Sequence, residues 1–309
     1  KVTLPSAGVW STGGVLTTER KEGAGAGTQT AGLAFGGRNN SYNDISTTEE
    51  YDGAAWSAGG VLPFPRHHLA GAGTQTAALA FGGVSFGPTV YYDVTNEYDG
   101  TNWSTGGVLS QAKFNLAGAG TQNAGLAFGG RDSSYVLAPC TEEYNGASWS
   151  TAGVGPLSTP RSVLAGTGTQ NAALAFGGPY GSSIKTCTEE YNGATWSSGG
   201  TLSQGREKLA GAGTQTAGLA FGGKHLYSTY SSHTEEYDGT NWSTGGALST
   251  ARACLGGAGT QNAGLAFGGN NLYCSPQTLT ATEEYTKVGG SVTKTFDYSG
   301  STGAVILSQ

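Results

Sequence analysis

The sequence predicts an all-β fold, a six-bladed β-propeller with four antiparallel strands per blade. Three observations predict it: a motif occurs six times, each copy divides into four short strand-like segments, and no segment has helical periodicity. Only 12% of the 309 residues are charged and 55 are Gly, but 6 Trp, 15 Tyr and 10 Phe supply the aromatic core that disordered chains lack.

Three landmarks recur in the same order in each unit. A Phe-Gly-Gly tripeptide, preceded by A-G-T-Q-[TN]-A-[GA]-L-A, returns every 45 to 48 residues. It begins at Phe35, Phe81, Phe128, Phe176, Phe221 and Phe267. The other two landmarks are a Glu-Tyr pair ending at Tyr51, Tyr98, Tyr144, Tyr191, Tyr237 and Tyr285, and a Trp at positions 10, 56, 103, 149, 196 and 242. Such a period is typical of propeller blades.

Each unit reads as two hairpins. In the second unit, residues 69–73 and 77–81 flank a tight turn, and alternation places Leu79 and Phe81 on one face and small residues on the other. A Thr-Glu-Glu-Tyr strand follows in five units and Thr-Asn-Glu-Tyr in the second. In five of the six units this strand ends in Asp-Gly or Asn-Gly. These dipeptides tolerate the positive φ of a type I′ turn, so we expect a second hairpin whose last strand carries the Trp.

The ends of the chain predict how the ring closes. Trp10 precedes the first Phe-Gly-Gly, and no Trp follows Tyr285. The N-terminal strand, about residues 6–14, is therefore expected to complete the last blade. We expect one propeller domain over residues 1–285, and a tail over 286–309 that serves as an extra edge strand or a connector. A chain that begins at Lys1 is expected to be processed or partial.

The order of Gly-Gly, Tyr, Trp and a basic residue resembles kelch and galactose-oxidase-type propellers over about residues 6–285, although the Tyr-to-Trp gap is shorter here. The near-verbatim units E-E-Y-[DN]-G-x-x-W-S-x-G-G and L-A-G-A-G-T-Q-x-A-G-L-A-F-G-G are similar to kelch-like repeat proteins predicted in marine bacteriophages. That resemblance implies a virion- or tail-associated protein. Propellers host many functions, so the resemblance implies the fold more than the activity.

A charge pattern repeats with the units. Cations occupy equivalent positions at Arg20, Arg66, Lys113, Arg161, Arg206 and Arg252. The expected partners are the acids before the Tyr: Glu50, Glu97, Glu143, Glu190, Glu236 and Glu284. A glycosidase needs one carboxylate pair at one site, whereas these acids recur in every unit. We therefore expect structural ion pairs and no catalytic residues.

The loop after each Phe-Gly-Gly differs in every copy: residues 38–48, 84–96, 131–141, 179–188, 224–234 and 270–282. These loops should emerge on one face. They supply the candidate binding residues Tyr42, Phe86, Tyr91, Tyr92, Tyr135, Tyr180, His225, Tyr227, Tyr230 and Tyr273. Tyr beside Ser, Gly and Asn is the composition of adaptable binding loops. The alternative is that these rings only pack the loops onto the rim.

Other chemistry finds little support in the sequence. None of the four His has the spacing of the oxidase copper site, and His67-His68 is interpreted as an incidental substitution. We expect no metal and no cofactor. Cys254 and Cys274 could meet and form a disulfide, whereas Cys140 and Cys187 occupy equivalent positions too far apart for one.

The net charge of −6 carries no basic cluster, which speaks against nucleic acid. No apolar run reaches the roughly 18–20 residues that span a bilayer. The expected function is a non-enzymatic recognition module, extracellular or on a virion surface, that binds a glycan or protein receptor. A structural decoration protein buried against neighbouring virion proteins is the alternative, and a secreted enzyme is the third hypothesis.

Overall fold

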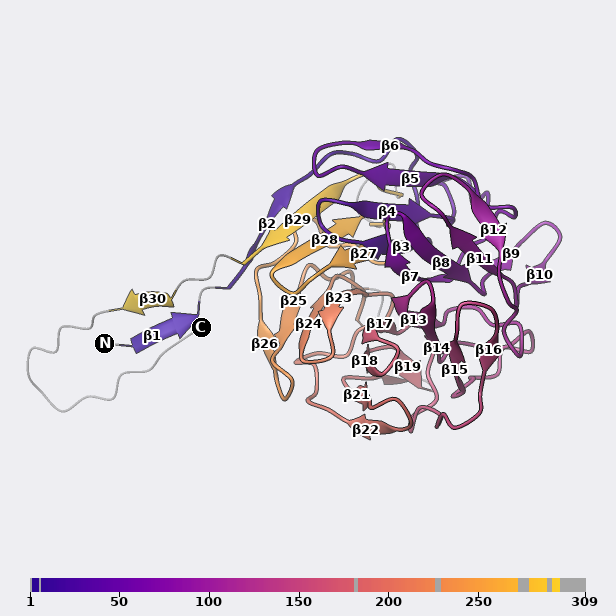
Figure 1. Ribbon diagram of the computed structural model, residues 1–309. Helices are drawn as coiled ribbons and strands as arrows, with labels where there is room; N and C mark the ends of the chain where they lie inside the picture. Colours follow the sequence, from indigo (N-terminus) through magenta and orange to yellow (C-terminus); the bar gives the residue numbers. More distant parts are fainter. Residues whose placement is uncertain are drawn as a thin grey trace, which may run out of the picture.

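The computed structural model describes residues 2–5, 7–180, 183–225, 229–271, 278–287 and 291–294. Six antiparallel four-stranded sheets stand in a ring around a central axis (Figure 1), which confirms the predicted six-bladed β-propeller. No helix in these ranges is long and apolar enough to cross a membrane.

Each blade runs from an inner strand at the axis to an outer strand at the rim. Blade 1 contains β3 (Ala24–Gly27), β4 (Gly32–Phe35), β5 (Thr48–Tyr51) and β6 (Trp56–Ala58); blade 2 contains β7 (Ala70–Thr74), β8 (Ala77–Phe81), β11 (Thr95–Tyr98) and β12 (Trp103–Thr105). Blade 3 contains β13 (Ala117–Thr121), β14 (Ala124–Phe128), β15 (Thr141–Tyr144) and β16 (Trp149–Ser150); blade 4 contains β17 (Ala165–Thr169), β18 (Ala172–Phe176), β21 (Thr188–Tyr191) and β22 (Trp196–Ser198). Blade 5 contains β23 (Ala210–Thr214), β24 (Ala217–Phe221), β25 (Thr234–Tyr237) and β26 (Trp242–Thr244); blade 6 contains β27 (Gly256–Gly259), β28 (Ala263–Phe267), β29 (Thr282–Thr286) and β2 (Val9–Thr12).

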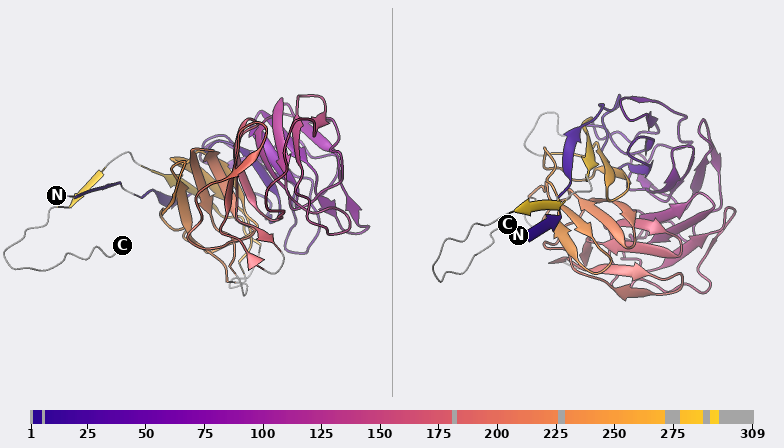
Figure 2. Two further views of the ribbon diagram at one scale, coloured as in Figure 1. Left: turned by 90° about the horizontal axis from the view of Figure 1, so that it is seen from below. Right: turned by 60° about the vertical axis from the view of Figure 1, so that its left-hand side comes forward.

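The ring closes as predicted. The N-terminal strand β2 pairs with β29, with Trp10 opposite Tyr285, so blade 6 holds both ends of the ring together (Figure 1). Beside the ring, β1 (Val2–Pro5) pairs with β30 (Ser291–Lys294) as a separate two-stranded sheet (Figure 2). Two small hairpins lie in the variable loops: β9 (Val84–Ser85) with β10 (Val90–Tyr91), and β19 (Pro179–Tyr180) with β20 (Ser183–Ile184).

The core lies between the blades. Leu79 and Phe81 of β8 pack toward blade 3, whereas Ala78 and Ala80 face blade 1. All four side chains are fully buried. The large residues of one sheet therefore fill the space above the small residues of the next, as the alternation predicts.

Glycine allows the inner strands to approach each other at the axis. A Cβ atom on Gly71 would lie 2.7 Å from Phe35 Cζ and 2.8 Å from the carbonyl oxygen of Gly25. Any side chain here would push neighbouring blades apart, which explains the Gly-rich inner strands.

The outer hairpins differ from the prediction in their turn. Tyr51 pairs with Trp56, so the loop between β5 and β6 has four residues instead of the two of a type I′ turn. Only Gly53 has a positive φ, +92°. The Asp52 carboxylate accepts hydrogen bonds of 2.8 Å from the backbone N–H groups of Ala54 and Ala55, and so holds the loop.

The cations are buried, but their partner is the other acid. All six are at most 2% exposed. The observed pairs are Arg20–Glu49 (2.7 Å), Lys113–Glu142 (2.5 Å), Arg161–Glu189 (2.9 Å), Arg206–Glu235 (2.6 Å) and Arg252–Glu283 (2.6 Å), and Arg66 donates to Asn96 Oδ1 (2.9 Å). The prediction that Glu50, Glu97, Glu143, Glu190, Glu236 and Glu284 are the partners is wrong. Adjacent strand residues face opposite sides, and only the first acid faces the cation of its own unit.

The second acid binds the next blade instead. It accepts the Tyr hydroxyl at 2.5 to 3.0 Å, in the pairs Tyr98–Glu50, Tyr144–Glu97, Tyr191–Glu143, Tyr237–Glu190, Tyr285–Glu236 and Tyr51–Glu284. Each Trp Nε1 likewise donates to a Thr hydroxyl of the preceding blade, at 2.8 to 2.9 Å. The Tyr and Trp landmarks of the repeat therefore supply the hydrogen bonds that join neighbouring blades.

These tyrosines predict alkaline unfolding. Burial, together with the hydrogen bond to Glu, raises the pKa of Tyr98 and Tyr237 to about 12, and that of the other four tyrosines is raised as well. The unfolded chain loses these protons from about pH 10 and the folded chain later, so stability is full below pH 10 and falls between pH 10 and about 12. We expect the free energy of unfolding in urea to drop by roughly 1.4 kcal/mol per pH unit for each tyrosine. A Tyr237→Phe variant should show a shallower slope. A profile that stays flat to pH 11.5 would contradict the prediction.

Candidate functional site

The variable loops and the entrances to the inner strands lie on one face of the propeller, called here the loop face. Ala24 at the start of β3 pairs with Phe35 at the end of β4, so the loop that follows β4 leaves beside the segment that enters β3. Equivalent bridges join Lys21 to Arg38, His67 to Val84, Phe114 to Arg131, Glu207 to Lys224 and Ala253 to Asn270. This arrangement gathers the non-repeated residues of the described loops around the axis.

Six residues at equivalent entrances form a closed ring, called here the mouth ring. They are Glu22, His68, Asn115, Val163, Lys208 and Cys254. Each has a φ of +51° to +61°. Each backbone N–H donates to the carbonyl oxygen of the equivalent residue in the preceding blade, and the six bonds of 2.7 to 3.0 Å close around the axis. The repeat therefore fixes the backbone of the ring and leaves its side chains free to differ.

The side chains of the mouth ring are half-buried and surround a cavity of about 90 Å³. Below it the axis is lined by the Leu residues that precede the inner strands and by Gly and Ala of these strands, with Thr167 among them. Glu22 lies near two of its neighbours, with its Oε1 3.7 Å from His68 Nε2 and 3.9 Å from Cys254 Sγ. Acid, imidazole and thiol groups thus converge on one small polar space.

The charge states follow from burial. Burial raises the pKa of the Cys254 thiol to about 12, so it stays protonated at neutral pH and lacks the thiolate that nucleophilic cysteines need. Burial, aided by Lys208, lowers the pKa of His68 to about 3. Burial and the neighbouring His68 lower the pKa of His67 to about 4, although Asp44 acts in the opposite direction. Both imidazoles are therefore neutral at pH 7.

A larger groove lies between the loops of blades 1 and 2, beside the mouth. Its volume is about 360 Å³. It is lined by Tyr42, Asn43, Asp44, Pro65, Ser85, Phe86, Gly87, Pro88, Val90 and Tyr92. The rings of Tyr42 and Phe86 are 59% and 44% exposed, and the Arg38 guanidinium lies 5.5 and 5.2 Å from their centres. This groove, called here the aromatic groove, contains three of the predicted binding residues.

Two further predicted residues, Tyr91 and Tyr135, pack against each other beside the aromatic groove. The ring of Tyr135 lies 5.4 Å from Phe114 and 6.2 Å from Tyr91, and its own side chain is 53% exposed. Tyr92 stacks on Phe64 at 6.0 Å. Some of these rings therefore pack against other loop side chains, whereas the side chains of Tyr42 and Phe86 remain exposed.

Two other predicted residues that the structure describes, His225 and Tyr230, do not line the groove. In blade 5, Nδ1 of His225 lies 3.0 Å from the carbonyl oxygen of Gly205, and the Tyr230 hydroxyl accepts a hydrogen bond from Asn270 (3.0 Å). Tyr227, Tyr273 and the Tyr180 side chain lie outside the described residues, as does Cys274. Cys140, Cys187 and Cys254 carry free thiols.

Sequence reasoning missed Glu22, Arg38 and Asp44, and treated His67 and His68 as incidental. The usable signal was positional. One Leu or Gly precedes each inner strand, and the two residues before that Leu or Gly differ in every unit, although they adjoin nearly invariant segments. Positions that vary within an otherwise fixed repeat indicate where such a chain carries its specific chemistry.

The chain thus belongs to the class of six-bladed propellers with a variable loop face. Among solved structures it resembles YjhT, with a TM-score of 0.73 and 14% identity over 88% of this chain and 96% of that one. At this identity the likeness supports the propeller fold alone. No family model matches the sequence, and no curated protein matches it. The kelch and phage resemblances therefore stay predictions.

Proposed function

We propose that this propeller is a non-enzymatic recognition module that binds a glycan in the aromatic groove. Two half-exposed rings, Tyr42 and Phe86, beside polar Asn43 and Ser85 carry the proposal. A sugar ring has an apolar C–H face that packs on aromatic rings, and hydroxyl groups at its edge that need polar partners. A groove of about 360 Å³ falls in the size range of small-ligand sites.

Departures from the repeat support the same place. Blade 2, which forms one wall of the groove, has Asn96 where the other five blades have the ion-pairing Glu, and Pro63 where they have Ser or Thr. Repeat proteins break their own rules mainly where function requires it. The resemblance to phage repeat proteins supports a location on a virion or cell surface, with the groove facing outward.

The test is a glycan array with the purified chain, followed by titration of the best glycan. Tyr42→Ala and Phe86→Ala should each weaken binding by about fivefold or more, since a lost ring contact costs on the order of 1–3 kcal/mol.

Tyr135→Ala is the matched control. Tyr135 has the same backbone conformation as Tyr42, with a φ of +62° against +61°, and similar exposure, but it lies outside the groove. It should bind normally. Equal losses in all three variants would place the ligand elsewhere on the loop face. A blank array from folded protein would overturn the proposal and favour a structural decoration protein.

A further inference from the structure

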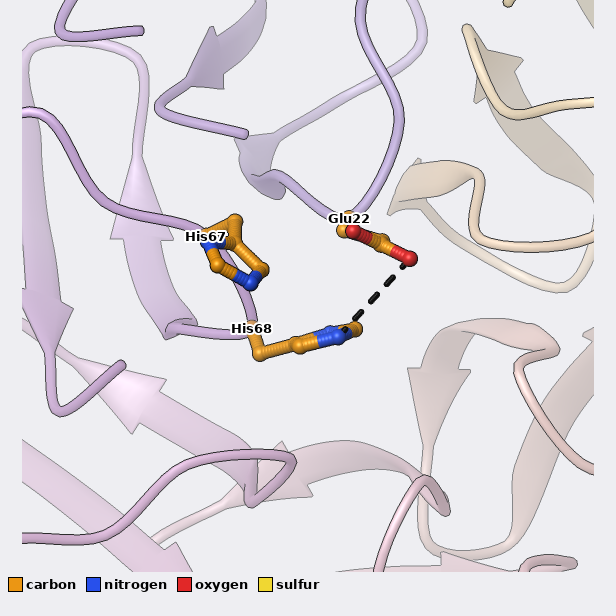
Figure 3. Close-up of side chains that lie close together, drawn as sticks. All are labelled: Glu22, His67 and His68. Atoms are coloured by element: carbon orange, nitrogen blue, oxygen red, sulfur yellow. Dashed lines mark ion pairs between the residues drawn. The ribbon is translucent and has the colours of Figure 1, made fainter. Parts of the chain in front are cut away.

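Three side chains at the entrances of blades 1 and 2 form a compact group of metal-ligand type. One ligand atom each of Glu22, His67 and His68 lies within 4.8 Å of the other two (Figure 3). They come from the segments that precede β3 and β7, so the group joins two blades across the edge of the mouth. It lies beside the aromatic groove but contains none of its lining residues.

The architecture of the ring makes this convergence possible. Adjacent residues of an extended strand point to opposite sides, and His67 and His68 would then be unable to share a ligand. His68 instead has a φ of +54°, which turns its side chain toward the same space as that of His67. Its N–H donates to the carbonyl oxygen of Glu22 at 2.7 Å, and this bond holds the third member beside it.

His67 has the surroundings of an oriented metal ligand. It is fully buried, and its Nε2, which points toward the other two side chains, has no hydrogen-bond partner (Figure 3). Its other ring nitrogen, Nδ1, lies 2.7 Å from Asp44 Oδ1. Histidines that bind metals commonly direct their second nitrogen to a carboxylate, which fixes the tautomer and the ring.

Asp44 is itself held in place. Its carboxylate contacts Arg38 Nε at 3.1 Å and accepts a hydrogen bond from the Phe86 N–H at 2.7 Å. Asp44 therefore acts as a positioning residue for His67. A buried imidazole nitrogen without a partner is costly in a folded protein unless something binds it.

We propose that Glu22, His67 and His68 bind one divalent transition-metal ion at the mouth of the axial channel. Two neutral imidazoles and one carboxylate suit Zn²⁺ or Fe²⁺ and do not suit Ca²⁺, which takes six to eight oxygen ligands. The remaining coordination positions face the cavity of the mouth ring and can take water or a ligand group. Lys208, on another blade of the ring, adds a positive charge that opposes the ion.

Metal titration of the chelator-treated 309-residue chain tests the proposal. Zn²⁺ and, under anaerobic conditions, Fe²⁺ are titrated separately by calorimetry, with Ca²⁺ as the negative probe. We expect one equivalent of Zn²⁺ or Fe²⁺ to bind, the tighter of the two identifying the ion, and the thermal midpoint to rise with it. Glu22→Gln and His68→Ala should each weaken binding at least tenfold, Asp44→Asn should weaken it about tenfold through His67, and Lys208→Met should tighten it.

The second histidine pair of the chain provides the control. The ring centres of His225 and His233 lie 5.8 Å apart in blade 5. His225→Ala therefore removes one imidazole from this second pair and leaves the proposed site intact. Its metal binding should equal that of the unmodified chain. The proposal is overturned if neither ion binds, if Glu22→Gln and His68→Ala bind normally, or if His225→Ala loses as much affinity as they do. Near-ultraviolet circular dichroism of each variant separates misfolding from loss of the site.

Discussion

Replacement of Glu235 by Gln is expected to lower the free energy of unfolding by about 3 kcal/mol. Glu235 is 2% exposed, and its Oε1 lies 2.6 Å from Nη2 of the fully buried Arg206. The amide keeps the shape of the side chain but leaves the guanidinium without a countercharge in a dry interior. Urea titration followed by Trp fluorescence measures the loss.

A partly exposed pair gives the comparison for this variant. Glu207 lies 3.2 Å from Lys224, but the two side chains are 16% and 24% exposed. Glu207→Gln should therefore cost less than about 1 kcal/mol. Similar losses of unfolding free energy in the two variants would show that the buried pair stabilises the fold no more than the partly exposed one. The contrast tests whether the repeated cations are structural, as their occurrence in every unit predicts.

The fold could be predicted from the sequence because the same pattern of four strands, with the same buried residues, recurs six times. Small and large residues alternate on β8, and this alternation predicts how the blades pack on each other. No Tyr-bearing strand precedes Trp10 in the chain, and this predicts that β2 closes the ring. The type I′ turn could not be excluded in advance, because Asp52-Gly53 serves equally in the four-residue loop that forms.

The error in the ion pairs came from a one-residue ambiguity. Two adjacent acids on a strand face opposite sides, and the sequence does not say which side meets the cation. The Tyr of the next blade removes the ambiguity: Tyr237 binds Glu190, and Glu189 is left for Arg161. Only the packing of one blade on another shows this division of roles.

The candidate site was predicted less completely than the fold. The composition of the variable loops predicted Tyr42 and Phe86 as candidate binding residues, and both line the groove. Glu22, His67 and Asp44 come from three separate segments, and each is unremarkable in the sequence. Their meeting depends on the positive φ of the mouth ring and on contacts between two blades, neither of which a single strand pattern reveals.

Blade 2 offers the opposite test of the buried ion pairs, because it lacks one naturally. Asn96 takes the place of the Glu, and burial lowers the pKa of Arg66 to about 10. Nη1 of Arg66 has no hydrogen-bond partner, whereas Nη1 of the equivalent arginines, such as Arg206, donates to backbone carbonyl oxygens. Blade 2 also lacks the backbone N–H that would hold the second oxygen of a Glu at this position. Elsewhere the second oxygen of the Glu accepts a backbone N–H, such as that of Ser203 to Glu235 at 2.7 Å, and Pro63 at the equivalent position has none.

The double variant Asn96→Glu with Pro63→Ser should therefore raise the free energy of unfolding by about 2 kcal/mol, the contribution of charge-assisted hydrogen bonds to a buried cation. Asn96→Glu alone should gain less, since one carboxylate oxygen stays unsatisfied, and Pro63→Ser alone should lose up to about 1 kcal/mol through the freer unfolded chain. A double-mutant cycle in urea should then give a favourable coupling of at least about 1 kcal/mol between the two positions. Strict additivity would mean that the new carboxylate does not reach Arg66 in the geometry of the other blades. If the stabilised variant also loses glycan binding, the absence of the ion pair in blade 2 is required for the shape of the aromatic groove that this blade borders.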